Sequence, residues 1–323
     1  SFAGRIAMAQ ADLWDVAPKP FDEFWKIFRN PAGESWQEGQ SLRQPELAQT
    51  YRTLAQNGTA AFYNGDFASR TEAWMKRNGG LLSASDFAAY RPKVREPIRS
   101  TYRGHEIIGF PPPSSGGVHV AQILNILEHF DLKSLGNGTP AYIHTIAEAM
   151  KLAFADRAHW LGDPDFSRVP RGLATTNYAD QLARRIHPDR VTPVSGHGQP
   201  PGANLDVFPR IPDTPAAAPD GKHTTHFSTA DADGNWVACT ATINTTFGSK
   251  VVVPGTGVVL NNEMDDFSAQ PGAPNAFGLV GAEANAVAPG KRPLSSMSPT
   301  IVLRDGRPIL AVGAAGGPTI ISQ

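Results

Sequence analysis

Two adjacent threonines in the segment KHTTHFS, residues 222–228, occupy a position that favours nucleophilic chemistry. Thr224 starts an alternating run that is typical of a strand, directly after a stretch rich in Pro, Gly and Ala. A threonine hydroxyl is a poor nucleophile unless a base lies beside it. If the peptide bond between His223 and Thr224 is cut, the new α-amino group, with an ordinary pKa of about 8, supplies that base within the same residue. Taken alone, the Thr-Thr pair also fits an ordinary β-branched start of a strand.

Further candidate residues follow in short polar segments. These are TATINTTFG (240–248), LNNEMDDFS (260–268), KRPLSSMSPT (291–300) and the glycine pair at 316–317. By themselves, Thr242 fits a strand residue, Glu263 and Asp266 fit a solvated acidic loop, and the glycines fit a turn. The one cysteine, Cys239, lies in an alternating run and is interpreted as a packed strand thiol rather than as a nucleophile.

The order of these segments resembles the γ-glutamyltransferase (glutathione hydrolase) family of N-terminal-nucleophile hydrolases. The match is dense from residue 224 to residue 317 and extends upstream through FPPPSSGG (110–117), ADR (155–157) and LGDPDF (161–166). The resemblance implies that Thr224 first attacks the carbonyl of His223, which cleaves the chain, and then attacks the γ-glutamyl amide of a substrate such as glutathione. Water, an amino acid or a peptide then accepts the γ-glutamyl group. It also implies that neither a metal nor an organic cofactor is needed.

The resemblance also assigns roles to the other segments. Thr242 matches the threonine whose hydroxyl bonds the nucleophile and tunes it. Gly316 and Gly317 match the oxyanion hole, where bare N–H groups face the developing negative charge. The matches to the residues that hold the α-amino and α-carboxylate groups of the glutamyl substrate are Asn244, Glu263 and Asp266, and the serines that contact the α-carboxylate are matched by Ser295 and Ser296. The family varies between Gln and Glu at the position of Glu263.

Two features of the family are altered or unmatched in this sequence. Residues 271–282 match the lid loop over the pocket, where some members carry a tyrosine gate at the position of Phe277. Phenylalanine lacks the hydroxyl for a hydrogen-bonded latch, although its ring can still shield the acyl-enzyme from water. The family's arginine that pairs with the substrate α-carboxylate belongs to an N-terminal region that this chain does not match, and no arginine upstream of Thr224 is assigned that role.

The elements that must position these residues are mostly helical before residue 188 and stranded after residue 224. Apolar spacing predicts helices over residues 45–57, 67–77, 118–127 and 140–159, the last with Thr139 as N-cap and Pro140 at the first helical position. A hairpin is predicted over 96–110 and an exposed linker over 188–223. Strands are predicted over 225–230, 235–243, 257–261, 300–304 and 309–312, the last two joined by a turn at 305–306.

By resemblance, these elements form one α+β domain, the four-layer αββα sandwich of N-terminal-nucleophile hydrolases, incomplete at both ends. Residues 1–223 correspond to the C-terminal part of a large-subunit region and residues 224–323 to the N-terminal part of a small-subunit region. Self-cleavage would then produce a large and small subunit pair. The chain starts without Met or a signal pattern and stops where an element is starting, so both ends look truncated. The family expectation for location is the periplasm or the outside of the cell.

Composition narrows the class of partner. A net charge of −1 gives no indication of a nucleic-acid or anionic-membrane partner and favours a small-molecule substrate, and no apolar run approaches a membrane span. Two rival interpretations remain. One is a cephalosporin acylase-like or poly-γ-glutamate-cleaving amidase on the same scaffold, and Asn244, Asp266 and the serine pair weigh against it because they suit a free glutamyl head group. The other is an unprocessed, inactive protein that kept the fold.

Overall fold

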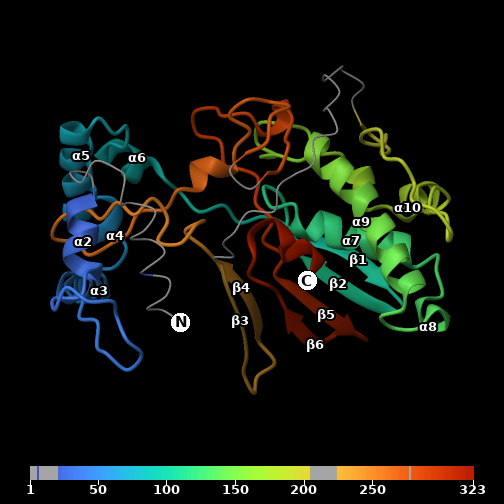
Figure 1. Cartoon of the computed structure of the whole chain (residues 1–323), viewed down its shortest axis with the longest axis horizontal. Coiled ribbons are helices and arrows are strands. Elements are labelled where there is room, and N and C mark those ends of the chain that lie inside the picture. The colour runs from blue at the N-terminus through green and yellow to red at the C-terminus, as the bar shows by residue number, and fades with distance from the viewer. Residues whose placement is uncertain (1–5, 7–20, 204–223, 276–277) are drawn as a thin grey trace. The chain divides into compact units, whose positions relative to one another are not determined.

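The computed structural model describes residue 6 and residues 21–203, 224–275 and 278–323. The chain divides into two compact units (Figure 1). The first unit contains Ser1–Val94 and Ile243–Asn262, and the second contains Arg95–Thr242 and Glu263–Gln323. The segment 243–262 thus leaves the second unit directly after Thr242 and returns to it at Glu263, so two candidate site residues mark the crossing points.

The first unit is helical in the part that the structure describes. Its helices are α2 (Asp22–Phe28), α3 (Pro45–Asn57), α4 (Ala60–Tyr63), α5 (Asp66–Asn78) and α6 (Ala84–Ala89). Aromatic side chains hold it together: Phe24 and Phe28 on α2 pack against Phe247, with ring centroids 5.4 and 4.7 Å apart respectively. Such aromatic pairs add to the free energy of apolar burial. This packing explains why residues 243–262 join the N-terminal helices rather than the strands that precede them.

The second unit contains an antiparallel sheet with the order β1-β2-β5-β6. Its strands are β1 (Ile98–Tyr102), β2 (His105–Gly109), β5 (Thr300–Arg304) and β6 (Arg307–Val312). The predicted hairpin over 96–110 is confirmed, and its second strand pairs with β5, from Glu106 opposite Leu303 to Gly109 opposite Thr300. The sheet is therefore built from both sides of the 188–223 segment.

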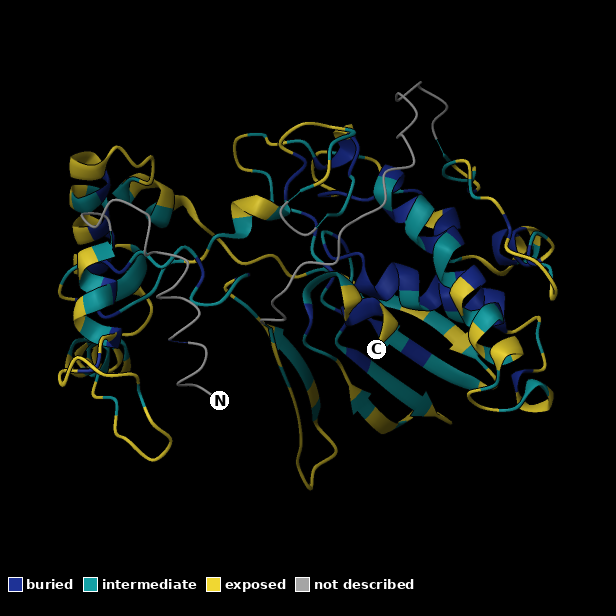
Figure 2. Cartoon of the chain, viewed as in Figure 1, coloured by how far each residue is buried: buried dark blue, intermediate teal, exposed yellow. Residues whose placement is uncertain are grey.

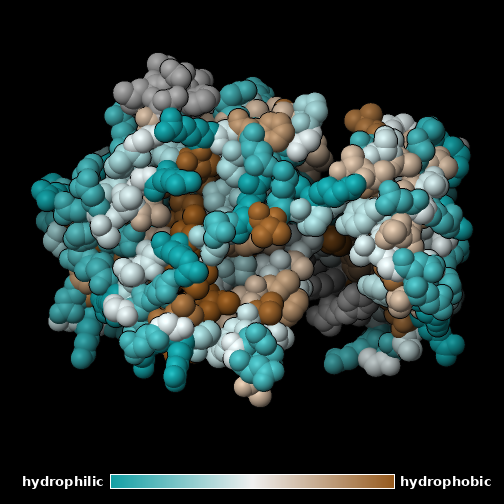
Figure 3. All heavy atoms as spheres, turned by 180° about the vertical axis from the view of Figure 1, so that it is seen from behind, coloured by the Kyte–Doolittle hydropathy of each residue, from teal (hydrophilic) through white to brown (hydrophobic). Residues whose placement is uncertain are grey.

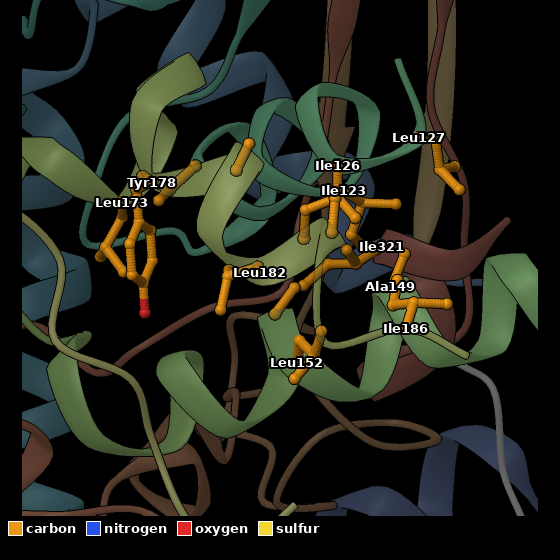
Figure 4. Packing of buried hydrophobic residues seen from close by; sticks show 14 of the residues in the cluster. Ile123, Ile126, Leu127, Ala149, Leu152, Leu173, Tyr178, Leu182, Ile186 and Ile321 are labelled. Carbon is orange, nitrogen blue, oxygen red and sulfur yellow. The ribbon is translucent and has the colours of Figure 1, made fainter. Parts of the chain in front are cut away.

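Helices of the second unit cover one face of this sheet. They are α7 (Gly116–Leu127), α8 (Leu132–Leu135), α9 (Pro140–Trp160) and α10 (Thr176–Ala183), with a 3-10 turn at Arg171–Ala174. Ten of the twelve residues of α7 are buried because α7 lies between the sheet and the helices α9 and α10 (Figures 1 and 2). Figure 4 shows how Ile123 and Ile126 of α7 meet Leu152 of α9 and Leu182 of α10 in the core. The predicted N-cap Thr139 is confirmed, since its side chain accepts a hydrogen bond from the N–H of Tyr142.

A separate hairpin carries the residues that follow Thr224. Strand β3 (Thr225–Ala230) pairs antiparallel with β4 (Trp236–Ala241), from Thr225 opposite Ala241 to Ala230 opposite Trp236. The hairpin lies beside the end of the larger sheet, where the Ser228 hydroxyl donates to the carbonyl of Ala311 at 3.2 Å. Cys239 is half-buried on β4, as a strand position predicts.

Outcomes for a predicted strand, the predicted linker and the absence of a membrane span follow from the described residues. The strand predicted over 257–261 is wrong: these residues contribute only an isolated bridge between Val252 and Val259, because left-handed glycines at Gly255 and Gly257 break the extended run. Residues 188–203 form no regular element, but part of this segment is packed and not exposed as predicted, since Thr192 is buried and its N–H donates to Glu148 on α9 at 2.9 Å. Residues 204–223 lie outside the described residues. No helix in the described ranges is long and apolar enough to cross a bilayer.

The pictured surface is mainly polar. On the face shown in Figure 3, hydrophilic residues dominate and apolar residues gather in a few places. In the described part of the chain, no group of three or more His, Cys, Asp or Glu side chains is arranged to hold a metal ion.

Candidate active site

Thr224 stands directly before β3, and Thr242 directly follows the paired strand β4. The antiparallel register brings these two ends of the hairpin together, and the Thr224 Oγ1 donates to the Thr242 Oγ1 at 3.5 Å. That separation is long for a hydroxyl pair, which usually lies near 2.8 Å. The hairpin thus positions the two threonines that the sequence singled out, eighteen residues apart in the chain.

His226 fixes the start of β3 against the strand β6. Its Nδ1 lies 2.8 Å from the Thr240 hydroxyl, and its Nε2 lies 3.0 Å from the Ser228 hydroxyl. Because Ser228 gives its proton to the Ala311 carbonyl, it must accept from Nε2, which leaves Nδ1 as the acceptor from Thr240. Burial lowers the pKa of His226, which favours this neutral form. A side chain at Gly313 would meet this ring, since an added Cβ there would lie 2.2 Å from Nδ1.

The segment after Gly313 leads to the glycine pair of the predicted oxyanion hole. Gly316 has φ 152° and Gly317 has φ 54°, both conformations that residues with a Cβ adopt rarely. A short 3-10 helix, Gly317–Ser322, begins there. Among the described residues, neither N–H group of the pair donates a hydrogen bond. Two unsatisfied backbone donors at the start of a helical turn are suited to a developing negative charge.

Glu263 and Asp266 occupy the two ends of a 3-10 turn, Glu263–Asp266. Burial is the main cause that raises the pKa of both carboxyl groups. The neighbouring carboxylates of Asp266 and Asp265 raise the pKa of Glu263 further. Their side chains are hydrogen-bonded, so the proton of Glu263 is shared with Asp266. Carboxyl groups whose pKa values are raised by burial and by a neighbouring carboxylate are candidates for a functional site.

Ser295 and Ser296 are held by the junction that precedes α7. The N–H and the hydroxyl of Ser115 both donate to the Ser295 carbonyl, at 2.8 and 2.7 Å, and the N–H of Ser295 donates to the Pro113 carbonyl at 3.0 Å. Gly116 permits this close approach, because an added Cβ would lie 2.2 Å from the Met297 carbonyl oxygen. The motif FPPPSSGG therefore fixes the backbone of the serine pair, a use that the sequence did not reveal.

Asn285 joins the acidic turn to the segment that leads into the serine pair. Its Nδ2 donates to the Asp266 carbonyl at 2.8 Å, and its Oδ1 accepts from the Leu294 N–H at 2.9 Å. The side chain is 4% exposed, so water does not compete for these bonds. One buried amide thus fixes the distance between two candidate binding segments.

Arg157, near the end of α9, lies at the centre of this group and was not singled out from the sequence. Its Nε donates to the Ser115 hydroxyl and its Nη2 to the Ser296 hydroxyl, each at 2.9 Å. The side chain is 4% exposed, and burial lowers its pKa to about 10, so it remains charged at neutral pH. Its charge in turn lowers the pKa of Asp266, opposing the effect of burial.

Three further predicted site residues lie in the first unit or outside the described residues. Asn244 belongs to the first unit, where it is 9% exposed, has φ 77° and donates from Nδ2 to the Asn262 carbonyl at 3.0 Å. Asparagine tolerates this left-handed conformation better than most residues. Phe277 and His223 lie outside the described residues.

Comparisons with known proteins agree with these motifs. The family model described as Gamma-glutamyltranspeptidase matches residues 3–323. A curated relative, the glutathione hydrolase proenzyme of Escherichia coli K12, is 46% identical over 300 residues, which cover 93% of this chain and 48% of the relative. The chain thus spans about half the length of the curated relatives it matches.

Two solved structures have similar folds. A cephalosporin acylase from Bacillus halodurans is 27% identical with a TM-score of 0.77, and the match covers 98% of this chain and 52% of the acylase. A γ-glutamyltranspeptidase from Helicobacter pylori is 39% identical with a TM-score of 0.55, over 59% of this chain and 54% of that protein. The similar structures therefore include a cephalosporin acylase and a γ-glutamyltranspeptidase, the two kinds of enzyme considered from the sequence.

Proposed function

Because this chain belongs to the gamma-glutamyltranspeptidase family, we propose that it carries the nucleophile and the glutamate-recognition residues of a self-cleaving γ-glutamyltransferase and glutathione hydrolase. The observation that carries the proposal is the position of Thr224. It directly precedes β3, and its hydroxyl lies 3.5 Å from that of Thr242 across the hairpin.

Maturation is the first step of the proposed chemistry. The Thr224 hydroxyl attacks the carbonyl carbon of His223, the peptide C–N bond breaks, and the threonine nitrogen leaves as an amine with the proton from the hydroxyl. The resulting ester is hydrolysed by water, which leaves a carboxylate on His223 and a free α-amino group on Thr224. The products are the large and small subunits, and Thr224 becomes the first residue of the small one.

Turnover then uses the same hydroxyl. The Thr224 α-amino group accepts the hydroxyl proton while Oγ1 attacks the γ-carbonyl carbon of a γ-glutamyl amide. The Gly316 and Gly317 N–H groups stabilise the oxyanion, and Thr242 donates to the attacking oxygen or accepts from it. Collapse of the intermediate passes the proton to the leaving amine, and water or an amino-group acceptor later takes the γ-glutamyl group from Thr224. No step of this sequence calls for a metal or an organic cofactor.

Substrate recognition is assigned to the two ends of the glutamyl head group. Glu263 and Asp266 hold the α-ammonium end, and Ser295 and Ser296 contact the α-carboxylate. Asn244 is assigned to the α-ammonium end by the resemblance alone. A paired carboxyl site suits an ammonium group, because hydrogen bonds to ionised groups are the stronger ones. The raised pKa values of Glu263 and Asp266 support this assignment, since an arriving cation would stabilise their ionised forms.

The proposal includes the architecture and location of the whole protein. The proposed architecture is the four-layer αββα sandwich of N-terminal-nucleophile hydrolases, with residues 1–223 in the large-subunit region and residues 224–323 in the small-subunit region. By resemblance, residues 271–282 are assigned to the family's lid loop, with Phe277 at the position of the tyrosine gate. The mature pair acts in the periplasm or outside the cell.

The test follows maturation and turnover together. The protein expressed from its complete coding sequence should give two fragments on a denaturing gel, with intact masses that correspond to a cut between His223 and Thr224, and it should hydrolyse γ-glutamyl-p-nitroanilide. Thr224→Ala should stay in one piece and be inactive. Cleavage at the same bond in Thr224→Ala would contradict the assignment of the nucleophile, and a single inactive wild-type band would support the unprocessed, inactive alternative.

A second candidate is an acylase, favoured by the structural match to the Bacillus halodurans cephalosporin acylase. A glutaryl amide retains the carboxylate of a γ-glutamyl amide but lacks its α-ammonium group. The ratio of kcat/KM for the two p-nitroanilides therefore reports whether Glu263 and Asp266 receive an ammonium. Preference for the γ-glutamyl compound supports the transferase, and preference for the glutaryl compound supports the acylase.

A further inference from the structure

Arg157 is a buried cation whose hydrogen bonds end on both serines of the proposed carboxylate subsite. Its side chain is 4% exposed, and no carboxylate oxygen of the described residues lies within 4.0 Å of its guanidinium. Removing a cation from water is costly unless other groups repay the cost. Asp266 acts on the Arg157 charge only over a longer distance, and no ion pair neutralises the guanidinium directly among the described residues. The guanidinium therefore suits a site that receives an anion from outside the protein.

The direction of the hydrogen bonds determines what the serine hydroxyls can do. Arginine carries donors and no acceptor, so the Ser296 Oγ must accept from Nη2. The hydroxyl proton of Ser296 is consequently left to donate elsewhere, and a donor is what a carboxylate ligand requires. Without the guanidinium, the same hydroxyl could rotate and present a lone pair toward the anion.

The second hydrogen bond from the Arg157 guanidinium goes to Ser115. Its hydroxyl accepts from the Arg157 Nε at 2.9 Å and donates its own proton to the Ser295 carbonyl at 2.7 Å. The two hydrogen bonds run in one direction, from Arg157 to the Ser115 hydroxyl and from that hydroxyl to the Ser295 carbonyl, so the first bond polarises the second. One guanidinium therefore orients the Ser296 hydroxyl directly and the Ser295 main chain through one intermediate.

We propose that Arg157 is a positioning residue for the carboxylate subsite: it sets Ser296 as a hydrogen-bond donor, fixes the Ser295 backbone through Ser115, and supplies positive charge behind both. This inference rests on the proposed function and adds to it a residue to which neither motif nor resemblance gave a role. The ligand of this subsite is the α-carboxylate of the glutamyl group in a γ-glutamyl amide.

The experiment compares two substrates that differ only at this group. They are γ-glutamyl-p-nitroanilide and the analogue in which the α-carboxylate is an α-carboxamide. The ratio of their kcat/KM values is independent of the fraction of protein that has matured. In the protein expressed from its complete coding sequence, Arg157→Lys keeps the charge but cannot serve both serines, and the ratio should fall by about 10-fold or more, mainly through KM. Ser296→Ala should lower the ratio similarly.

A structural role alone would give a different result. If Arg157 only stabilises the fold, Arg157→Lys lowers the yield of mature protein or its Tm and leaves the ratio unchanged. Arg95→Lys is the matched control: Arg95 lies in the same unit, pairs with Asp163 and Asp165 at 3.3 and 2.9 Å, and should leave the ratio at the wild-type value.

Ser115→Ala keeps the inference testable if Arg157→Lys does not fold. It retains the cation and removes the hydroxyl that joins the Arg157 Nε to the Ser295 carbonyl, while the Ser115 N–H keeps its own bond to that carbonyl. A fall in the ratio of about 3-fold or more is expected. An unchanged ratio in Ser115→Ala and in any folded Arg157→Lys would overturn the role of Arg157. A wild-type protein that hydrolyses neither substrate would instead overturn the proposed function, and this inference with it.

Discussion

At the scale of single residues, the Thr224 hydroxyl depends on its neighbour across the hairpin. Thr242→Val keeps the shape of the side chain and removes the hydroxyl that lies 3.5 Å from Thr224 Oγ1. We expect kcat for γ-glutamyl-p-nitroanilide to fall by about 10- to 100-fold, the size of a lost hydrogen bond to a group that gains charge. Steady-state kinetics on mature protein measure this, with Thr242→Ser as the control that retains the hydroxyl. Equal kcat values in Thr242→Val and wild type would show that Thr242 does not assist the nucleophile.

A second residue-scale prediction concerns pH. Burial and the adjacent carboxylates raise the pKa of Glu263 from 4.5 to about 7, so the folded state binds its proton more tightly than the unfolded state does. The contribution of this group to stability is therefore complete below pH 4.5 and is lost as the pH rises toward 7. Glu263→Gln imitates the protonated form and should raise Tm by a few degrees at pH 8 and by nothing at pH 4.

Thermal unfolding across pH checks this prediction, with the exposed Glu38→Gln as the matched control. A Tm difference between Glu263→Gln and wild type that does not change with pH would contradict it. The same ionisation should affect turnover, because an ammonium group binds the ionised pair. The KM of wild type for γ-glutamyl-p-nitroanilide should therefore rise as the pH falls below 7.

The site residues that could be identified from the sequence and those that could not differ in how far along the chain their partners lie. Thr224 starts an alternating run after a linker, a local pattern that left its role open, and the ordered segments that carry the family resemblance then assigned it as the nucleophile. Arg157 belongs to a short motif that supported the resemblance, but its chemistry depends on Ser115 and Ser296, which are 42 and 139 residues away. Only folding brings such partners together, so no spacing rule could assign it a role.

At the scale of elements, one buried amide holds the acidic turn and the serine segment in register. Asn285 uses its donor and its acceptor on two different backbones, so Asn285→Asp loses the bond to the Asp266 carbonyl and Asn285→Leu removes both. We expect Asn285→Leu to lower Tm and to raise KM by about 10-fold, with Asn285→Asp intermediate in KM near neutral pH. Calorimetry and steady-state kinetics measure the two effects. An unchanged KM in Asn285→Leu would show that the two segments keep their spacing without it.

Most element types were predictable from local signals, and the strand wrongly predicted over 257–261 shows where such signals fail. The hairpins at 98–109 and 300–312 carry alternation and a tight turn, and Asp305 and Gly306 have φ 51° and 73°, as that turn requires. The segment 257–261 has strand-like residues but packs with the helices of the first unit, where Val252 and Phe247 are parts of the core. Tertiary packing overrides strand propensity at such positions.

At the scale of the whole molecule, self-cleavage should not separate the two subunits under native conditions. Strand β2 lies before the predicted cut and β5 after it, and the two share a ladder of four residue pairs. A native gel should show one species, while a denaturing gel shows two. Dissociation of the fragments under native conditions would contradict a shared sheet, and Thr224→Ala, which stays in one piece on both gels, is the control.

The order β1-β2-β5-β6 also changes the kinetics of folding once the chain has been cut. Before cleavage, β2 finds β5 within one chain, and the rate of refolding from denaturant does not depend on protein concentration. After cleavage, the same ladder joins two molecules, so recovery becomes second order and slows as the protein is diluted. Mature protein that is fully unfolded and dilute should therefore recover its fold far more slowly than the precursor does, because β2 and β5 no longer belong to one chain.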